Sequence, residues 1–225
     1  MAQAWAARVK TTPAVIAAQI RRALRQGGSA EHAQGVQRFF KEEIKSHGWP
    51  TADLRRAAVR FRRQIQKEHG LDFLVEVADQ LFLGSVREEK IAAVFLLEKL
   101  DAEFGDREYK LFESWLGRIR SWADHDALVH YCIAPMLAAK PARLKTVFRW
   151  AKSADRWHRR AACVALIRAR GRRCFFPKSS SLQNCYSLTK TIWSRRDREV
   201  RRPANCGIFD ENSRPCFSLG IAHRL

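Results

Sequence analysis

The sequence predicts an all-α protein on three observations. Apolar residues recur at intervals of three and four from about residue 13 to residue 170, and strand-like alternation is nearly absent. The breaks between these periodic segments carry glycine, proline or a capping residue. At 225 residues and 46% hydrophobic content, the chain is long enough to bury one sizeable core. We therefore expect one helical domain over residues 1–171.

The expected helices follow one another with short connections. Thr51 and Asp53 mark a helix start ahead of Leu54, and Ser85 with Glu88 forms a capping-box pattern ahead of an apolar run. Glycines and prolines at the breaks fit αα-hairpin turns. The predicted helices are 13–26, 30–45, 51–68, 71–84, 86–102, 106–119, 121–138, 142–151 and 154–169.

The lengths of these helices favour a particular architecture. Many short helices without strands must bury their apolar faces by packing in pairs. Pairs of this combined length are typical of a HEAT- or armadillo-like superhelical solenoid of antiparallel helix pairs, whose curvature creates a concave face. The repeats show no self-similar sequence, so a compact irregular helical bundle is the competing form.

The segment 172–225 differs in character from the rest. It has no sustained helical period and is rich in serine, asparagine, arginine and proline. Its patterned apolar surface is too small to offset the entropy cost of ordering. We therefore expect a basic, irregular, poorly ordered C-terminal tail.

Composition narrows the function. A formal charge of +19 and a pI near 10.5 make a polyanion the expected partner, although a basic, merely soluble protein would share this composition. The sequence shows no leader-like segment and no apolar run long enough to span a membrane, so we expect a cytoplasmic protein. The cysteines lack zinc or disulfide spacing. Phosphate-loop, zincin and serine-hydrolase motifs are absent, which disfavours those enzyme classes.

The most informative stretch begins at Trp122. Trp122 and Asp126 are four residues apart, so a helix places both on one face. Asp126 is a candidate functional carboxylate, although an acid near a helix start also compensates the helix dipole. Asp124 pairs with Ser121 as a helix cap. A metal site at His125 is disfavoured because no second histidine stands at ligand spacing.

A second group of candidates lies about thirty residues later. Arg159 and Arg160 can contact phosphate through their rigid guanidinium forks. Trp157 can join the same face, but a tryptophan at helical spacing is more often part of a core. Ala161 and Ala162 are small enough for a neighbouring helix or a ligand backbone to approach closely.

These residues resemble a family, the bacterial HEAT-repeat DNA alkylation-repair glycosylases of the AlkD type. The likeness covers about residues 33–171. It lies in the aromatic-Lys segment at Arg38–Lys41, the Gly-Trp-Pro turn at Gly48–Pro50 followed by Arg55, the Trp-x-x-x-Asp pair, and the Trp-x-x-Arg-Ala-Ala helix from Trp157.

The resemblance implies roles for individual residues. Asp126 would be the catalytic carboxylate, with Trp122 against the deoxyribose. Arg160 would contact the DNA backbone and Phe39 would be a cleft aromatic, while Arg159 and Trp157 would lie in the same DNA-binding region. The reaction implied is cleavage of the N-glycosidic bond of cationic N3- or N7-alkylated purines in double-stranded DNA. The resemblance implies no metal and no cofactor, and we expect a monomer near the bacterial nucleoid.

The chemistry suits these residue types. Departure of a cationic base leaves positive charge on the sugar, which a carboxylate and aromatic faces stabilise. The alternative is a catalytically inactive helical-repeat DNA-binding protein, and a protein-interaction scaffold is a third possibility. The alternative gains weight because the family's further C-terminal helices are missing from 172–225. The coding sequence for Thr191 to Asp197, read two bases later, can encode a segment resembling the family's Asp-Met-Val-Gln-Lys-Gly, so a frame-shifted tail is one hypothesis.

Overall fold

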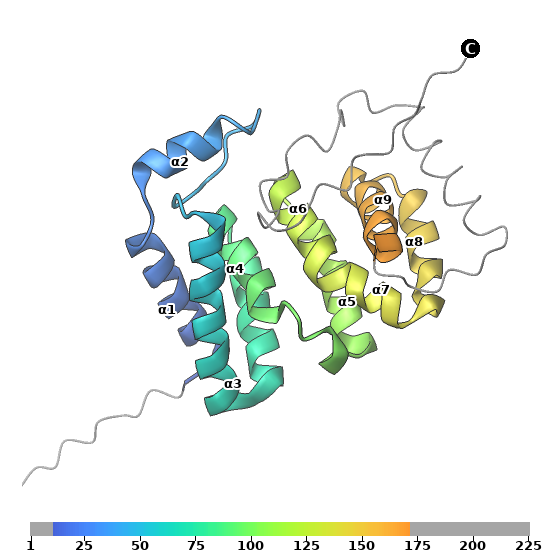
Figure 1. The fold of residues 1–225 in the computed structure, drawn as a ribbon, viewed down its shortest axis with the longest axis horizontal. Coiled ribbons are helices and arrows are strands. Elements are labelled where there is room, and N and C mark those ends of the chain that lie inside the picture. Colours follow the sequence, from blue (N-terminus) through green and yellow to red (C-terminus); the bar gives the residue numbers. More distant parts are fainter. Residues whose placement is uncertain (1–10, 172–225) are drawn as a thin grey trace, which may run out of the picture.

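The structure is a computed structural model that describes residues 11–171, and every regular element in that range is a helix (Figure 1). The all-α prediction is therefore confirmed for these residues. The predictions for 172–225, including the frame-shift hypothesis, lie outside them. The α-helices are α1 (Pro13–Gln26), α2 (Ala30–Gln37), α3 (Thr51–Phe82), α4 (Arg87–Leu97), α5 (Asp106–Trp115), α6 (Trp122–Leu128), α7 (Ala134–Ala139), α8 (Leu144–Ala151) and α9 (Arg156–Gly171). The short turns are η1 (Asp101–Glu103), η2 (Leu116–Arg118), η3 (Val129–Ile133) and η4 (Pro141–Arg143).

The helices pack against one another in succession. α1 lies against α3, α3 against α4 and α4 against α6, while α7 and α8 both pack on α9 (Figure 1). α4 is the centre of the core, because each of its residues from Glu88 to Leu97 is buried. The solenoid path of these pairs stays a prediction. Among the described residues, no helix has the length and apolar character needed to cross a membrane.

Local chemistry explains where the first helices begin and break. The Thr12 hydroxyl accepts a hydrogen bond from the Val15 N–H, and Pro13 occupies the first turn, so α1 matches the predicted 13–26. Gly70 has φ 83° and interrupts α3. This backbone conformation strongly favours glycine. The two predicted helices 51–68 and 71–84 therefore lie on either side of a real break.

α2 ends at Gln37 and is therefore shorter than the predicted helix 30–45. The Gln37 side chain accepts a hydrogen bond from the Ile44 N–H at 3.0 Å and donates to the Glu42 carbonyl at 2.9 Å. These bonds take the place of helical backbone bonds and hold residues 38–44 in a non-helical path. The segment 38–50 is thus a structured loop rather than a continuation of the helix.

The predicted capping box at Ser85 is wrong. Val86 is the N-cap of α4 and makes no side-chain cap bond. Glu88 is fully buried and accepts hydrogen bonds from the Ser46 hydroxyl at 2.7 Å and the His47 N–H at 2.8 Å. Burial opposes ionisation of Glu88, but these bonds outweigh it and lower its pKa. The carboxylate therefore fastens the 38–50 loop to the core helix.

Candidate active site

The start of α6 is fixed by the predicted cap, which the structure confirms. The Ser121 hydroxyl accepts from the Asp124 N–H at 3.3 Å, and the Asp124 carboxylate accepts from the Ser121 N–H at 3.1 Å. Asp124 is almost fully buried, which raises its pKa, while the charge of Lys90 acts in the opposite direction. Asp124 thus orients the first turn of α6 rather than facing a ligand.

The far end of the predicted helix 121–138 departs from α-helical geometry. α6 ends at Leu128, and the π-helical turn η3 connects it to α7. Pro135 lies in the first turn of α7 and has no N–H to donate. A wider π-turn accommodates such a missing bond, and such turns are frequent at functional sites. Trp122 and Asp126 therefore lie on one short helix, just before this irregular turn.

Trp122 is half-buried, and its indole is covered by Phe40 from the 38–50 loop. The two rings stack with centroids 4.9 Å apart and planes 15° apart. Phe39 is instead 70% exposed. The structure thus brings Phe40 rather than Phe39 onto the predicted sugar-facing tryptophan, and Phe39 remains only a predicted DNA contact.

Asp126 forms a two-pronged ion pair with Arg160. Arg160 Nε lies 2.9 Å from Asp126 Oδ1, and Arg160 Nη2 lies 2.6 Å from Asp126 Oδ2. His125 Nδ1 lies 2.8 Å from the same Oδ1. The Asp126 side chain is only 13% exposed, so burial opposes its charge, but the bonds from His125 and Arg160 outweigh burial and lower its pKa. Asp126 is therefore a carboxylate at neutral pH.

α9 supplies Arg160 from a helix whose first turn is also capped. The Asp155 carboxylate accepts from the Trp157 N–H at 2.9 Å. The Trp157 ring stacks on His125 with centroids 5.6 Å apart. Arg159 donates to the carbonyl oxygens of the preceding turn, at Ser153 and Ala154. The predicted residues Asp126, Arg160 and Trp157 are thus brought together.

The small residues after Arg160 serve helix packing. Ala161 and Ala162 are fully buried in the core. Of the two explanations that the sequence allows, the close approach of a neighbouring helix is the one observed. This packing sets the distance between α9 and α6, and thereby the reach of Arg160 to Asp126.

Three residues that matter here were missed by sequence reasoning: Phe40, Glu88 and His125. Phe40 stood beside Phe39 in the same motif, and nothing in the sequence distinguishes which ring turns toward Trp122. Glu88 fitted a capping pattern, and its long-range use depends on the path of the loop. His125 was weighed as a metal ligand, and its bond to the neighbouring Asp126 was not predicted. Within residues 11–171, no cluster of three or more His, Cys, Asp or Glu side chains could hold a metal ion.

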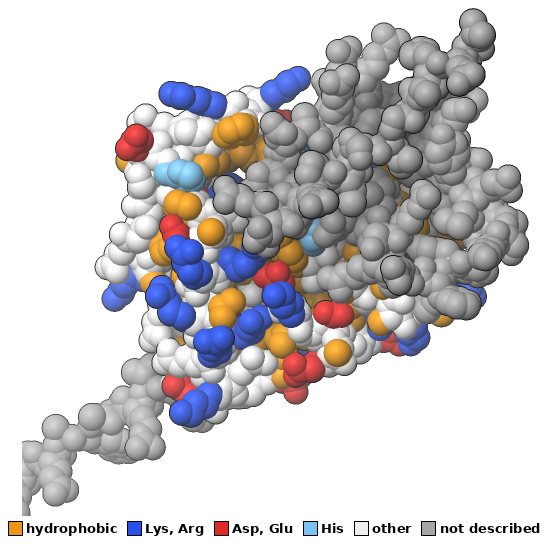
Figure 2. Space-filling view, in the orientation of Figure 1, with side chains coloured by type: hydrophobic (Ala, Val, Ile, Leu, Met, Phe, Trp, Pro, Cys, Tyr) orange, Lys and Arg blue, Asp and Glu red, His pale blue; other side chains and the backbone are white. Residues whose placement is uncertain are grey.

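The surface charge is uneven. Lys and Arg side chains gather over α3 in Figure 2. Four exposed cations there are spaced by four, three and four residues and so share one helix face. They form what we call the α3 basic stripe, which consists of Arg56, Arg60, Arg63 and Lys67.

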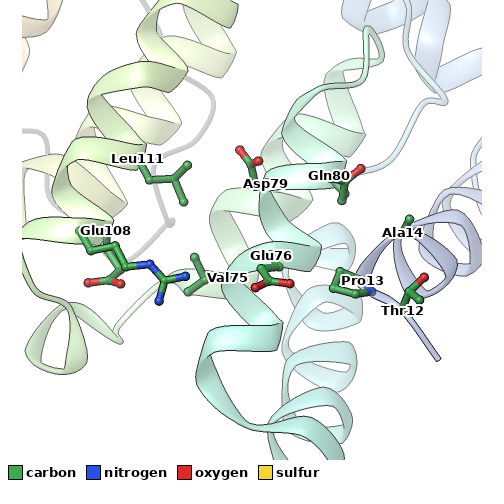
Figure 3. Close-up of a pocket in the computed structure, with 10 residues that line it drawn as sticks. Thr12, Pro13, Ala14, Val75, Glu76, Asp79, Gln80, Glu108 and Leu111 are labelled. Atoms are coloured by element: carbon green, nitrogen blue, oxygen red, sulfur yellow. The ribbon is translucent and has the colours of Figure 1, made fainter. Parts of the chain in front are cut away.

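A cavity of about 590 Å³ lies elsewhere, between α1, α3 and α5 (Figure 3). Its lining includes the carboxylates of Glu76, Asp79 and Glu108, and none of the predicted site residues. Carboxylates repel a polyanion, so this cavity is a poor location for nucleic acid.

The fold and site define a class: a basic protein, all-helical over residues 11–171, that holds a mostly buried, ionised carboxylate beside a stacked aromatic pair. The chain belongs to the family of DNA alkylation repair enzymes, whose family model matches residues 20–202. This match agrees with the resemblance to the AlkD type and extends beyond 33–171 at both ends. None of the curated proteins compared with the chain matches it. The family assigns the protein to the process of DNA alkylation repair.

Proposed function

We propose that the chain is a DNA glycosylase that excises cationic N3- or N7-alkylated purines from double-stranded DNA. One observation carries the proposal: Asp126 is an ionised carboxylate that is mostly buried and fixed from two sides, one helical turn from Trp122. A preorganised negative charge in a partly water-excluded site stabilises developing positive charge far better than a carboxylate in water does.

The reaction needs little more than such a charge. The bond between the sugar C1′ and the purine nitrogen breaks, and its electron pair leaves with the base and neutralises the base cation. The oxocarbenium-like sugar then faces Asp126 and the Trp122 ring. Water adds at C1′ and releases a proton to the solvent. Because the pKa of Asp126 is lowered, this residue serves as a charge stabiliser that orients water rather than as a strong base.

The predicted DNA contacts fit this reaction in different ways. Arg160 neutralises Asp126 in the free protein, and a DNA phosphate would compete for the same guanidinium. Phe39 is exposed and so is available to DNA. Trp157 instead stacks on His125 and supports the site by packing against that ring. We propose alkylated duplex DNA as the partner, with no cofactor, and a monomeric, cytoplasmic protein.

Release of 7-methylguanine and 3-methyladenine from methylated duplex DNA tests the proposal, with wild-type protein compared with Asp126→Asn. Asp72→Asn is the matched control, because Asp72 is 79% exposed on α3 and its ion pair within residues 11–171 is with exposed Arg107. We expect release by the wild type and the control, and a loss on the order of a hundredfold in Asp126→Asn. Thermal unfolding of both variants shows whether the lost activity reflects a lost fold.

The alternative, a DNA-binding protein without catalysis, has one observation in its favour. Both Asp126 oxygens already accept hydrogen bonds from Arg160, and the guanidinium charge partly neutralises the carboxylate before any sugar binds. Wild-type protein that is folded and binds duplex DNA with strong salt dependence, but releases no base, would establish this alternative.

A further inference from the structure

His125 is the buried residue whose hydrogen bonding the proposed reaction leaves unexplained. Its ring is fully buried. Nδ1 lies 2.8 Å from Asp126 Oδ1, and Nε2 lies 3.1 Å from the Trp157 carbonyl oxygen. Both neighbours are hydrogen-bond acceptors, whereas a neutral imidazole carries a single N–H. The ring can therefore satisfy one neighbour when neutral and both only when it takes up a second proton.

The charged groups around α6 are mostly engaged with other partners. On α4, Lys90 donates to the carbonyl oxygens of Phe82 and Arg118. On η3, His130 packs its ring against Tyr131. Two further carboxylates on α4 are also paired: Glu88 accepts bonds from the 38–50 loop, and Glu89 pairs with Arg21. Asp124 caps α6, and Arg160 on α9 binds the same Asp126 carboxylate as His125 does.

We propose that His125 is a positioning residue: its Nδ1–H holds the Asp126 carboxylate, and a second proton, bound at Nε2 and hydrogen-bonded to the Trp157 carbonyl oxygen, lowers the rate of base excision at acid pH. The proposal rests on the proposed glycosylase function. Of the two acceptors, the carboxylate is the stronger, so the neutral ring places its one proton on Nδ1.

Charge balance gives the direction of the pH effect. Protonation of His125 adds one positive charge beside Asp126 and Arg160, next to a sugar that becomes positive in the transition state, and this slows the reaction. Burial lowers the pKa of His125, against the bonds to Asp126 and the Trp157 carbonyl that raise it. The active form therefore prevails at neutral pH, and the inhibited form appears as the pH falls below His125's ordinary range.

The test is the pH dependence of kcat from pH 5 to 8 for wild type, His125→Val and His125→Asn. Valine removes the donor and cannot take up a proton, so we expect kcat on the order of tenfold below the wild type at pH 7 to 8, with little change in KM and no acid limb. Asparagine places an amide N–H near the position of Nδ1 but cannot titrate. We expect it to recover most of the lost kcat and to remove the acid limb seen in the wild type. An unchanged acid limb in His125→Asn, or full kcat in His125→Val, would overturn the proposal.

A second measurement keeps the proposal testable if the valine variant does not fold. Nitrogen NMR chemical shifts of the wild-type imidazole report its tautomer and its pKa without any turnover. We expect the Nδ1-protonated form at pH 7.5 and, in Asp126→Asn, a further drop of the His125 pKa because the carboxylate charge is gone. An Nε2-protonated ring would refute the positioning role. The expected tautomer in a wild type that releases no base would refute the glycosylase function while supporting the His125–Asp126 bond.

Discussion

Phe40 stacks on Trp122 with their rings nearly parallel, so a loop residue covers one face of the indole that stands one turn before Asp126. The position of that loop does not come from its own secondary structure. Buried Glu88 holds it from α4, and Gln37 holds it from α2. Gly48 allows its close approach, because φ is 77° there and a Cβ would lie 1.9 Å from the Ser29 carbonyl oxygen. One aromatic wall of the candidate site thus depends on contacts made far from it.

Replacing Phe40 should therefore lower the stability of the protein, whereas replacing Phe39 should hardly change it. Phe40→Ala removes a half-buried ring and its stacking on Trp122, and we expect the free energy of unfolding to fall by about 1–2 kcal/mol. Phe39→Ala removes an exposed ring and should change it by less than about 0.5 kcal/mol. Urea unfolding followed by circular dichroism measures both. Equal losses in the two variants would mean that the Phe40 stack contributes nothing.

The outcome for the fold shows what periodicity can predict. α1 was predicted to the residue, because its cap, its proline and its apolar spacing all agree. The end of α2 and the cap of α4 were misjudged, since the Gln37 and Glu88 side chains bond to a loop. Such long-range use of a polar side chain leaves no local pattern in the sequence.

The Arg160–Asp126 pair should contribute stability that depends on pH. The pKa of Asp126 in the folded protein lies below its ordinary value of 3.8. The pair's stabilisation is therefore fully present above that value and is lost as the pH falls through the folded pKa. Arg160→Gln removes a two-pronged guanidinium contact from a mostly buried carboxylate, so we expect a loss of about 2–3 kcal/mol at pH 7.

The control for this prediction is Arg107→Gln, because Arg107 pairs with Asp72 where both side chains are mostly exposed. Such a pair contributes little, and the loss should be below about 0.5 kcal/mol. Urea unfolding at pH 7, 5, 4 and 3 should show the wild type and Arg160→Gln converging only in the most acid samples. A difference that stays constant down to pH 3 would contradict the ionised pair.

The α3 basic stripe should contact the DNA backbone. The triple change of Arg56, Arg60 and Arg63 to Gln removes three exposed cations on one helix face. If all three meet phosphates, the slope of log K against log salt should become less steep by about 2.7, because each contact releases about 0.9 of a counterion. Fluorescence anisotropy with duplex DNA measures this slope. Arg107→Gln, in the lining of the cavity that also contains Glu76, Asp79 and Glu108, should leave the slope unchanged.

The sequence predicted which residues form the candidate site better than it predicted the hydrogen bonds between them. Spacing on a helix places Trp122 and Asp126 together, and the shared motif adds Arg160. The bond from His125 requires knowing that α9 packs on α6 and leaves no water around the imidazole. That burial follows from Ala161 and Ala162, which fit two different explanations when the sequence is considered alone.

Lys90 should give the unfolding free energy a distinctive alkaline dependence. It is almost fully buried, and burial lowers its pKa from 10.5 to about 8, despite the opposing charge of Asp124. Between those two values the unfolded chain binds more protons than the folded one, so stability rises with pH. Lys90→Met lacks this gain, and relative to it the wild type should become more stable by up to about 2 kcal/mol between pH 8 and 9.5.

The control is Lys67→Met, at an exposed position on α3, which should show the same pH dependence of stability as the wild type over this range. Parallel wild-type and Lys90→Met curves would mean that Lys90 loses its proton at the same pH in the folded and unfolded chains. Stability is compared only up to pH 9.5, because a second group titrates above it: burial raises the pKa of Tyr109 in the folded protein. Ionisation of that tyrosine in the unfolded chain therefore lowers stability at higher pH.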